Sequence, residues 1–200
     1  VVDPIVAWKG YIIGFWFTLG LALYGPFFVS TQHLPRAGWS ASLRRIPEAF
    51  GMFIPVAAVF GLIGMFLIPE GIFLWKNPAA INDPIFAKKA GFLNETGFYI
   101  TNVVAFVAWG AAYFAMRKFS LAQDEESDGA KVYELTNRLK ALSAIYLIVF
   151  AVGVSFMSWY WLMSLEPNWF STMFSVYTFA GMFQSGLALT YILMIYLGRK

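Results

Sequence analysis

Long apolar runs alternate with polar connections along the whole chain. The runs are close to or above the roughly 20 residues that an α-helix needs to cross a bilayer. They predict membrane spans at residues 8–30, 49–68, 95–116, 141–164 and 171–197. Charged side chains lie almost entirely between the runs, because placing them in hydrocarbon is costly. The pattern predicts an all-α, polytopic transmembrane helical bundle with these spans as its helices.

The last two runs flank an aromatic loop at residues 159–172. Pro167 disfavours helical backbone at the residue before it, so we expect the incoming helix to end near Leu165 and the outgoing helix to begin near Trp169 or Phe170. Tryptophan and tyrosine are concentrated in this loop, as is typical of a membrane–water interface. The sequence therefore predicts a tight membrane hairpin.

Composition supports the membrane class and excludes several chemistries. Hydrophobic residues make up 60% of the chain and charged residues only 12%, unlike soluble domains. The chain has no Cys and a single His, His33, so it lacks the ligands for iron–sulfur clusters, cysteine-linked haem or bis-histidine haem. We found no catalytic motif and no metal-ligand spacing, and the net charge of +3 is too small to indicate nucleic-acid binding. We expect no cofactor bound by this chain and no catalytic residue within it.

The distribution of basic residues predicts the orientation. The connections after the first, third and fifth spans contain ten of the 14 lysines and arginines, and cytoplasmic loops are enriched in such residues. These connections should be cytoplasmic, and the aromatic loop should face outward. The ten residues are Arg36, Arg44, Arg45, Arg117, Lys118, Lys131, Arg138, Lys140, Arg199 and Lys200.

One face of the third span carries polar and aromatic side chains. Glu95, Tyr99, Asn102, Trp109 and Tyr113 occupy positions i, i+4, i+7, i+14 and i+18, which coincide on one side of an α-helix. We expect this face to point into protein. It has two interpretations: a path for protons or water that begins at Glu95, or a seam of interhelical hydrogen bonds, which is the commoner arrangement.

Hydroxyl residues form a second pattern on the last two spans. Such stripes usually allow close helix packing, although a hydroxyl network with water also conducts protons. Gln184 lies off the stripe and needs a partner of its own. The stripe on the fifth span consists of Ser171, Ser175, Thr178 and Ser185, and Ser155 and Ser158 on the fourth span are placed to face it.

Three polar residues lie near the ends of the spans. Glu166 either caps the following helix, where an acidic residue is favourable, or takes up protons at the outer surface. His33 lies beside arginines at the cytoplasmic edge, which indicates either an orientation signal or a proton entry point with a near-neutral group. Glu48 is spaced to pair with Arg44 or Arg45 on a helix.

Three segments resemble one bacterial protein family. HLPRAGWSASLRRIPEA at residues 33–49 is similar to the first-loop pattern of the F subunit of alternative complex III, a quinol:cytochrome c or electron-acceptor oxidoreductase. KKAGFLN at 88–94 is similar to the lysine-rich step before the next helix of that subunit. SLEPNWFSTMFSVY at 164–177 resembles its most specific signature, although the family commonly has His where Asn168 stands.

The resemblance implies a membrane subunit without haem or metal, related to the polysulfide-reductase type, in the bacterial inner membrane. Its partners would be a sister membrane subunit that holds the quinol site, an iron–sulfur subunit and multihaem cytochrome c subunits, besides lipids. It would support the membrane core and offer a proton path. Members of the family are longer, and this chain begins at Val1 and not at Met, so we expect residues 1–200 to be a transmembrane-domain fragment of a longer subunit.

Two other functions remain open at this point. The chain could be a stand-alone secondary transporter, although we see no repeated pair of broken helices and expect no deeply buried charge to bind an ion. Alternatively, it could itself bind menaquinol or another quinol through the tryptophans and Glu166 at the outer surface.

Overall fold

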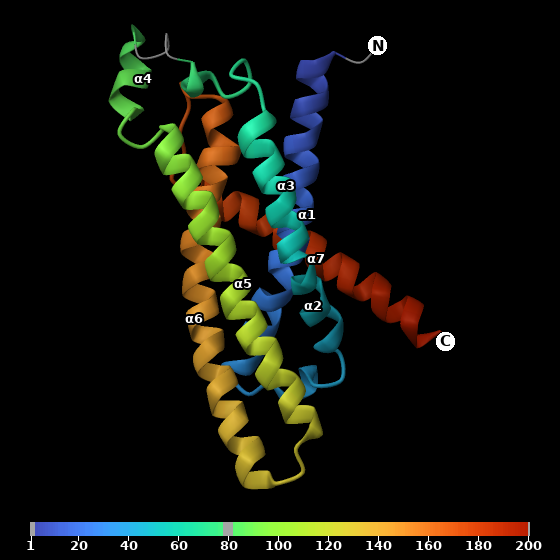
Figure 1. Ribbon diagram of the computed structural model, residues 1–200. Helices are drawn as coiled ribbons and strands as arrows, with labels where there is room; N and C mark the ends of the chain where they lie inside the picture. Colours follow the sequence, from blue (N-terminus) through green and yellow to red (C-terminus); the bar gives the residue numbers. More distant parts are fainter. Residues whose placement is uncertain (1–2, 78–81, 200) are drawn as a thin grey trace.

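The chain folds into a bundle of long helices, seen in a computed structural model that describes residues 3–77 and 82–199 (Figure 1). Within these ranges there is no strand, and five helical segments are long and apolar enough to cross a membrane. The expected all-α, multi-pass membrane fold is confirmed. The α-helices are α1 (Pro4–His33), α2 (Arg45–Phe50), α3 (Ile54–Leu67), α4 (Pro84–Lys89), α5 (Glu95–Glu125), α6 (Gly129–Trp161) and α7 (Phe174–Gly198).

The second membrane segment, Arg45–Leu67, is divided by a short 3₁₀ turn. α2 ends at Phe50, residues Gly51–Phe53 form the turn, and α3 begins at Ile54. Pro55 lies in the first turn of α3, where its missing N–H is harmless. In a continuous helix the same proline would leave a carbonyl one turn earlier without its donor, which is why the segment breaks at this point.

α5 and α6 continue well past the membrane boundaries expected from the sequence. We predicted that the third span ends at residue 116, whereas α5 continues to Glu125, and α6 begins at Gly129. The extensions run together beyond the rest of the bundle (Figure 1), and Gln123 Nε2 donates to Thr136 Oγ1 at 2.7 Å between them. The polar residues that end the span by hydropathy therefore do not end the helix.

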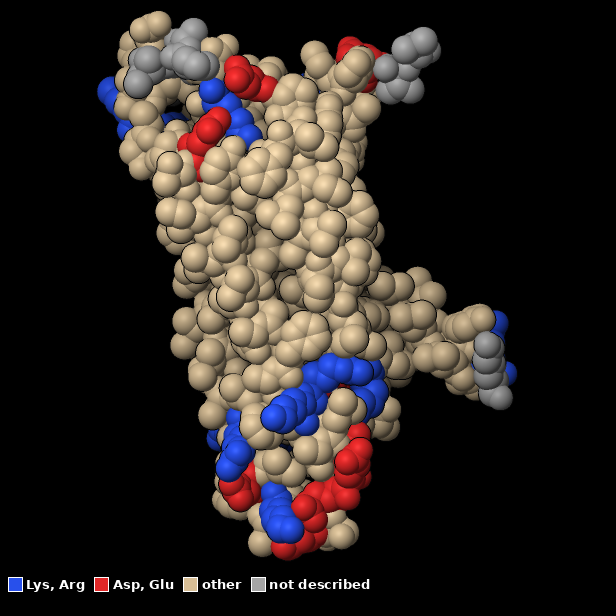
Figure 2. All heavy atoms as spheres, viewed as in Figure 1, with Lys and Arg blue, Asp and Glu red and all other residues tan. Residues whose placement is uncertain are grey.

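Charge divides the molecule into two polar ends and an apolar middle. On the face shown in Figure 2, lysine, arginine, aspartate and glutamate gather at the two ends of the bundle and basic atoms appear at the tip of the projecting α7, whereas the body of the bundle between its ends shows none of these side chains. Large apolar side chains cover this middle zone, including Phe66 and Val107, which are 68% and 64% exposed. Such a zone matches the hydrocarbon layer of a bilayer.

The interior is built mainly from aromatic side chains between α1, α3, α5 and α6. Trp109 and Trp161 are fully buried, and Phe15 lies 4.5 Å from Trp161 between ring centroids. Gly153 on α6 lies directly against the indole of Trp109, so a larger residue there would collide with the ring. The close approach of α5 to α6 thus depends on a glycine facing a tryptophan.

The expected tight hairpin between the last two spans is not formed. A 3₁₀ turn, Met163–Leu165, follows α6, and α7 begins only at Phe174, later than the predicted Trp169 or Phe170. α7 crosses α1 obliquely and extends away from the bundle (Figure 1). Gly186 of α7 lies against the ring of Tyr24 on α1, so this helix pair sets the direction of α7.

Candidate functional site

The inner part of the α5 polar face forms a hydrogen-bonded seam. Asn102, Trp109 and Tyr113 are each at most 1% exposed. Asn102 Nδ2 donates to the carbonyl of Phe98 at 2.8 Å, and its Oδ1 accepts from Trp161 Nε1 at 2.8 Å. Tyr113 Oη donates to the carbonyl of Glu48 at 2.9 Å. The polar groups of this seam are held by neighbouring α2 and α6 as well as by α5.

The outer end of the same face is not buried. Glu95, the first residue of α5, is exposed, and the expectation that it points into protein is wrong because it lies at the polar end of the bundle. Tyr99 is half-buried and stacks on Phe66 with 5.6 Å between ring centroids. Near them, burial lowers the pKa of Lys76, and the charges of Glu95 and Glu70 oppose this effect.

The hydroxyl residues of α6 and α7 meet at one point. Ser158 Oγ and Ser175 Oγ are 2.8 Å apart and both side chains are buried. Ser155 donates to the carbonyl of Ala151 in its own helix, and Thr178 donates to the carbonyl of Ser175 in its own helix. Ser175 Oγ also donates a longer hydrogen bond, 3.4 Å, to the carbonyl of Ser155. Among the described residues, Ser158 and Ser175 are thus the one pair of these hydroxyls that bond to each other across α6 and α7.

An ionic cluster lies where α2 meets α5, near the predicted cytoplasmic end. Glu48 is 4% exposed, and Arg45 Nη1 donates to its Oε2 at 2.5 Å. The same guanidinium donates to Ser120 Oγ at 2.7 Å and to the carbonyl of Ser120 at 2.9 Å, and it pairs with Asp124. Of the two arginines predicted as partners of Glu48, the structure selects Arg45.

Sequence analysis missed the α5 part of this cluster, although a signal was present. Ser120 and Asp124 lie at i+7 and i+11 from Tyr113, on the continuation of the same helix face. The predicted third span ends at residue 116, so the predicted polar face stops before these two residues. The expectation that the chain holds no deeply buried charge is also wrong, since Glu48 is buried; its charge is matched by Arg45 and is not available to bind an ion.

His33 is not part of an exposed basic edge. It is 8% exposed at the end of α1 and borders, together with Glu48, Tyr113 and Ser120, a gap too small to hold a water molecule. Its Nε2 is buried and has no hydrogen-bond partner among the described residues. Arg36, by contrast, is exposed and donates to Asn137 Oδ1 on α6 at 2.7 Å. His33 and Arg36, which are neighbours in the sequence, therefore contact different helices and do not form one basic surface.

Glu166 does not cap the following helix, α7. It is exposed, and α7 starts at Phe174, with Met173 as its N-cap residue and no side-chain cap. The predicted cap role is wrong because the irregular segment after Pro167 is longer than expected. Glu166 is also absent from the lining of the pocket that opens beside it.

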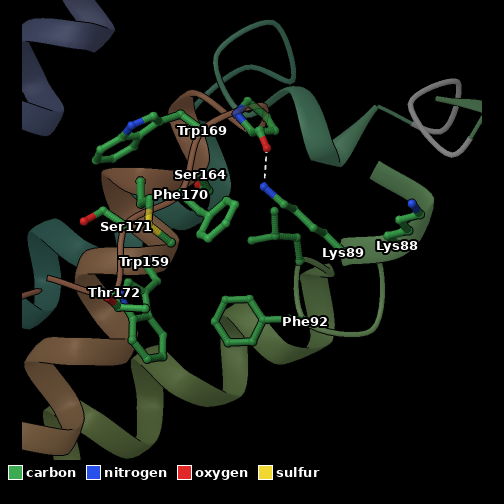
Figure 3. Close-up of a pocket in the computed structure, with 12 residues that line it drawn as sticks. Lys88, Lys89, Phe92, Trp159, Ser164, Trp169, Phe170, Ser171 and Thr172 are labelled. Carbon is green, nitrogen blue, oxygen red and sulfur yellow. Dashed lines mark hydrogen bonds between the residues drawn. The ribbon is translucent and has the colours of Figure 1, made fainter. Parts of the chain in front are cut away.

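This pocket, of about 400 Å³, lies between the segment that joins α4 to α5 and the end of α6 with its following loop (Figure 3). Lys89 Nζ donates to the carbonyl of Pro167 across it, and the ammonium lies 5.8 Å from the centre of the Phe170 ring. Tryptophan and phenylalanine rings form most of the remaining wall. The pocket is lined by Lys88, Lys89, Phe92, Leu93, Trp159, Met163, Ser164, Pro167, Trp169, Phe170, Ser171 and Thr172.

Comparison with known proteins yields no assignment, since no family model and no curated protein matches the chain. Within residues 3–77 and 82–199, no group of three or more His, Cys, Asp or Glu side chains is placed to hold a metal ion. Each of the three segments on which the resemblance rests makes a polar contact with another part of the chain. The first contributes Arg45 and Glu48 to the ionic cluster, and Lys89 of the second bonds to Pro167 of the third.

Proposed function

We propose that this chain is a cofactor-free, integral-membrane subunit of a bacterial quinol-oxidising complex of the alternative complex III type, in the inner membrane. Its partners in this proposal are a sister membrane subunit, an iron–sulfur subunit and multihaem cytochrome c subunits. The observation that carries it is the segment at residues 164–177, which resembles the signature of the F subunit. Here Ser164 Oγ accepts from Trp75 Nε1 at 3.0 Å and Ser175 bonds to Ser158, so the segment connects three parts of the fold.

The surface of α7 supports a role within a larger assembly. Its outer side chains are strongly exposed, with Tyr191 and Ile192 at 65% and 60%. Gln184 is exposed near the middle of this helix, where a bilayer offers its amide no hydrogen-bond partner. A neighbouring transmembrane helix with a polar side chain would satisfy Gln184, which fits a subunit better than a protein that acts alone.

The proposed proton role concerns the α5 seam and the Ser158–Ser175 contact. A Glu95→Gln or Asn102→Leu variant should lower proton translocation more than quinol oxidation, because electrons would travel through the partner subunits. Val103→Leu is the matched control for Asn102→Leu, since Val103 is 49% exposed on the same helix. Equal losses of both activities would indicate damaged assembly and would remove the proton role.

Deletion of the gene tests the assignment itself. Membranes from the deletion strain should lose quinol:acceptor activity, and the haem-bearing and iron–sulfur subunits should disappear from the membrane fraction together. Complementation with the unaltered chain should restore both. Unchanged quinol oxidation and unchanged partner levels in the deletion strain would refute the proposal.

A further inference from the structure

The pocket in Figure 3 lies at the end of the bundle that carries the aromatic loop, the end that the distribution of basic residues predicts to be outside. It is bounded by the end of α4, the residues just before α5, the last turn of α6 and the loop that follows. Its lining includes Lys88 and Lys89 but no aspartate or glutamate. Ser171 and Thr172 lie on the side of the pocket opposite the lysines, with the hydroxyl of Ser171 turned away from the cavity (Figure 3). This arrangement is complementary to an anionic group.

One donor in the wall is buried without a partner. Trp159 lines the pocket, and its Nε1 is shielded from solvent but has no hydrogen-bond acceptor among the described residues. A buried N–H without an acceptor costs free energy, which a ligand oxygen would recover. The indole N–H of Trp159 therefore lacks an acceptor, and no carboxylate of the lining balances the charge of the two lysines.

A second, apolar groove lies next to this pocket, on the outside of α5 and α6. It has a volume of about 430 Å³ and follows the contact between α5 and α6 from Ile100 to Ala108. These positions span about 12 Å of helix at 1.5 Å per residue. Phe156, in the wall of the groove, lies 5.2 Å from Trp159 and 6.0 Å from Phe92 of the headgroup pocket, measured between ring centroids. The ring of Phe156 therefore packs against the wall of the pocket while it lines the groove.

We propose that the pocket and the groove together form a specific site for one anionic glycerophospholipid of the outer leaflet. The phosphate lies beside the two lysines of the lining with Trp159 as a further donor, and one acyl chain follows the α5–α6 groove. A quinol fits less well, because oxidation needs a group that accepts protons. The pocket lining contains no His, Asp or Glu, and Glu166 lies outside it.

Native mass spectrometry of the protein, purified from membranes with any accompanying subunits, tests the headgroup site. The probes are dioleoyl phosphatidylglycerol and dioleoyl phosphatidylcholine at equal concentration. Lys88→Met should weaken phosphatidylglycerol retention about five-fold, from roughly 1 kcal/mol per basic residue near an anionic lipid, and Lys88→Met/Lys89→Met should abolish the preference. Lys9→Met, an exposed lysine at the same end of the molecule, is the charge-matched control and should change nothing.

A second pair of variants tests the acyl-chain groove. Val104 and Val107 are both exposed on α5, at 60% and 64%, but only Val104 lines the groove. Val104→Trp should block the groove and reduce retention of both lipids, whereas Val107→Trp should not. Equal retention of the two lipids by the unaltered protein overturns the proposal, as does displacement of phosphatidylglycerol by an equal concentration of a soluble menaquinol analogue. A partner helix in the groove would appear as a bound subunit with no retained lipid, and it too overturns the proposal.

Discussion

Removal of Arg45 should be the most damaging single change at the polar end of the bundle. The side chain of Glu48 is only 5% exposed, and its Oε2 accepts one hydrogen bond from Arg45 and a longer one, 3.3 Å, from Ser120. In an Arg45→Met variant the carboxylate stays buried with a hydroxyl as its remaining donor. Loss of one partner of a buried ion pair typically costs about 3–5 kcal/mol. We expect a decrease of this size in the free energy of unfolding.

A double-mutant cycle separates this effect from lost packing. Glu48→Gln keeps the shape of the side chain and an acceptor oxygen but removes the charge. It should lower the free energy of unfolding by about 1–2 kcal/mol, the difference between a charge-assisted and a neutral hydrogen bond. Arg45→Met/Glu48→Gln should be more stable than Arg45→Met alone, because no uncompensated charge remains. Unfolding by SDS titration in mixed micelles, followed by far-ultraviolet circular dichroism, gives all three free energies.

Arg138→Met is the matched control for Arg45→Met. Arg138 pairs with Glu134 at 2.6 Å on α6, but the two side chains are 55% and 61% exposed. Exposed pairs contribute about 0–1 kcal/mol because water screens the charges. If Arg45→Met and Arg138→Met lower stability by the same small amount, Glu48 is solvated in the protein, and the reasoning from its burial is refuted.

Three further predictions concern single side chains. Trp161→Phe should cost about 1–3 kcal/mol, because it leaves the buried Asn102 oxygen without its donor; an unchanged unfolding midpoint would contradict this. Gly186→Ala should lower stability by about 1–3 kcal/mol through overpacking against the adjacent tyrosine ring, whereas Gly181→Ala, which faces open space, should not; equal effects would exclude a helix contact at Gly186. Raising the pH toward 10.5 should increase the free energy of unfolding of the protein relative to that of Lys76→Met. The pKa of Lys76 is lowered in the folded state, so at this pH the folded lysine has released a proton that the unfolded lysine still holds. A difference between the two unfolding free energies that does not change with pH in chemical denaturation would refute this prediction.

The membrane segments could be predicted because hydrocarbon imposes a length and a composition on each of them. The face of α5 that carries Asn102, Trp109 and Tyr113 followed from the helical period alone, and all three side chains are buried. Helix ends were less predictable. The exposed first turn that places Glu95 outside the seam, and the polar extension of α5 to Glu125, depend on neighbouring helices that hydropathy does not describe.

Contacts between distant parts of the chain could not be predicted from the sequence. Glu48 is buried because Ser120 and Arg45 satisfy it, and Ser120 lies 72 positions away. The direction of α7 depends on Gly186 meeting Tyr24, a pair that no local pattern connects. The spacing of Glu48 from two arginines left two partners open, and only the position of α5 decides between them.

Native mass spectrometry of the tagged chain, released from its own membrane in mild detergent, measures whether it belongs to a larger complex. We predict one dominant species in which this chain is accompanied by haem c-bearing and iron–sulfur subunits and which oxidises quinol. A monodisperse chain without partners in every mild detergent would contradict the proposed function.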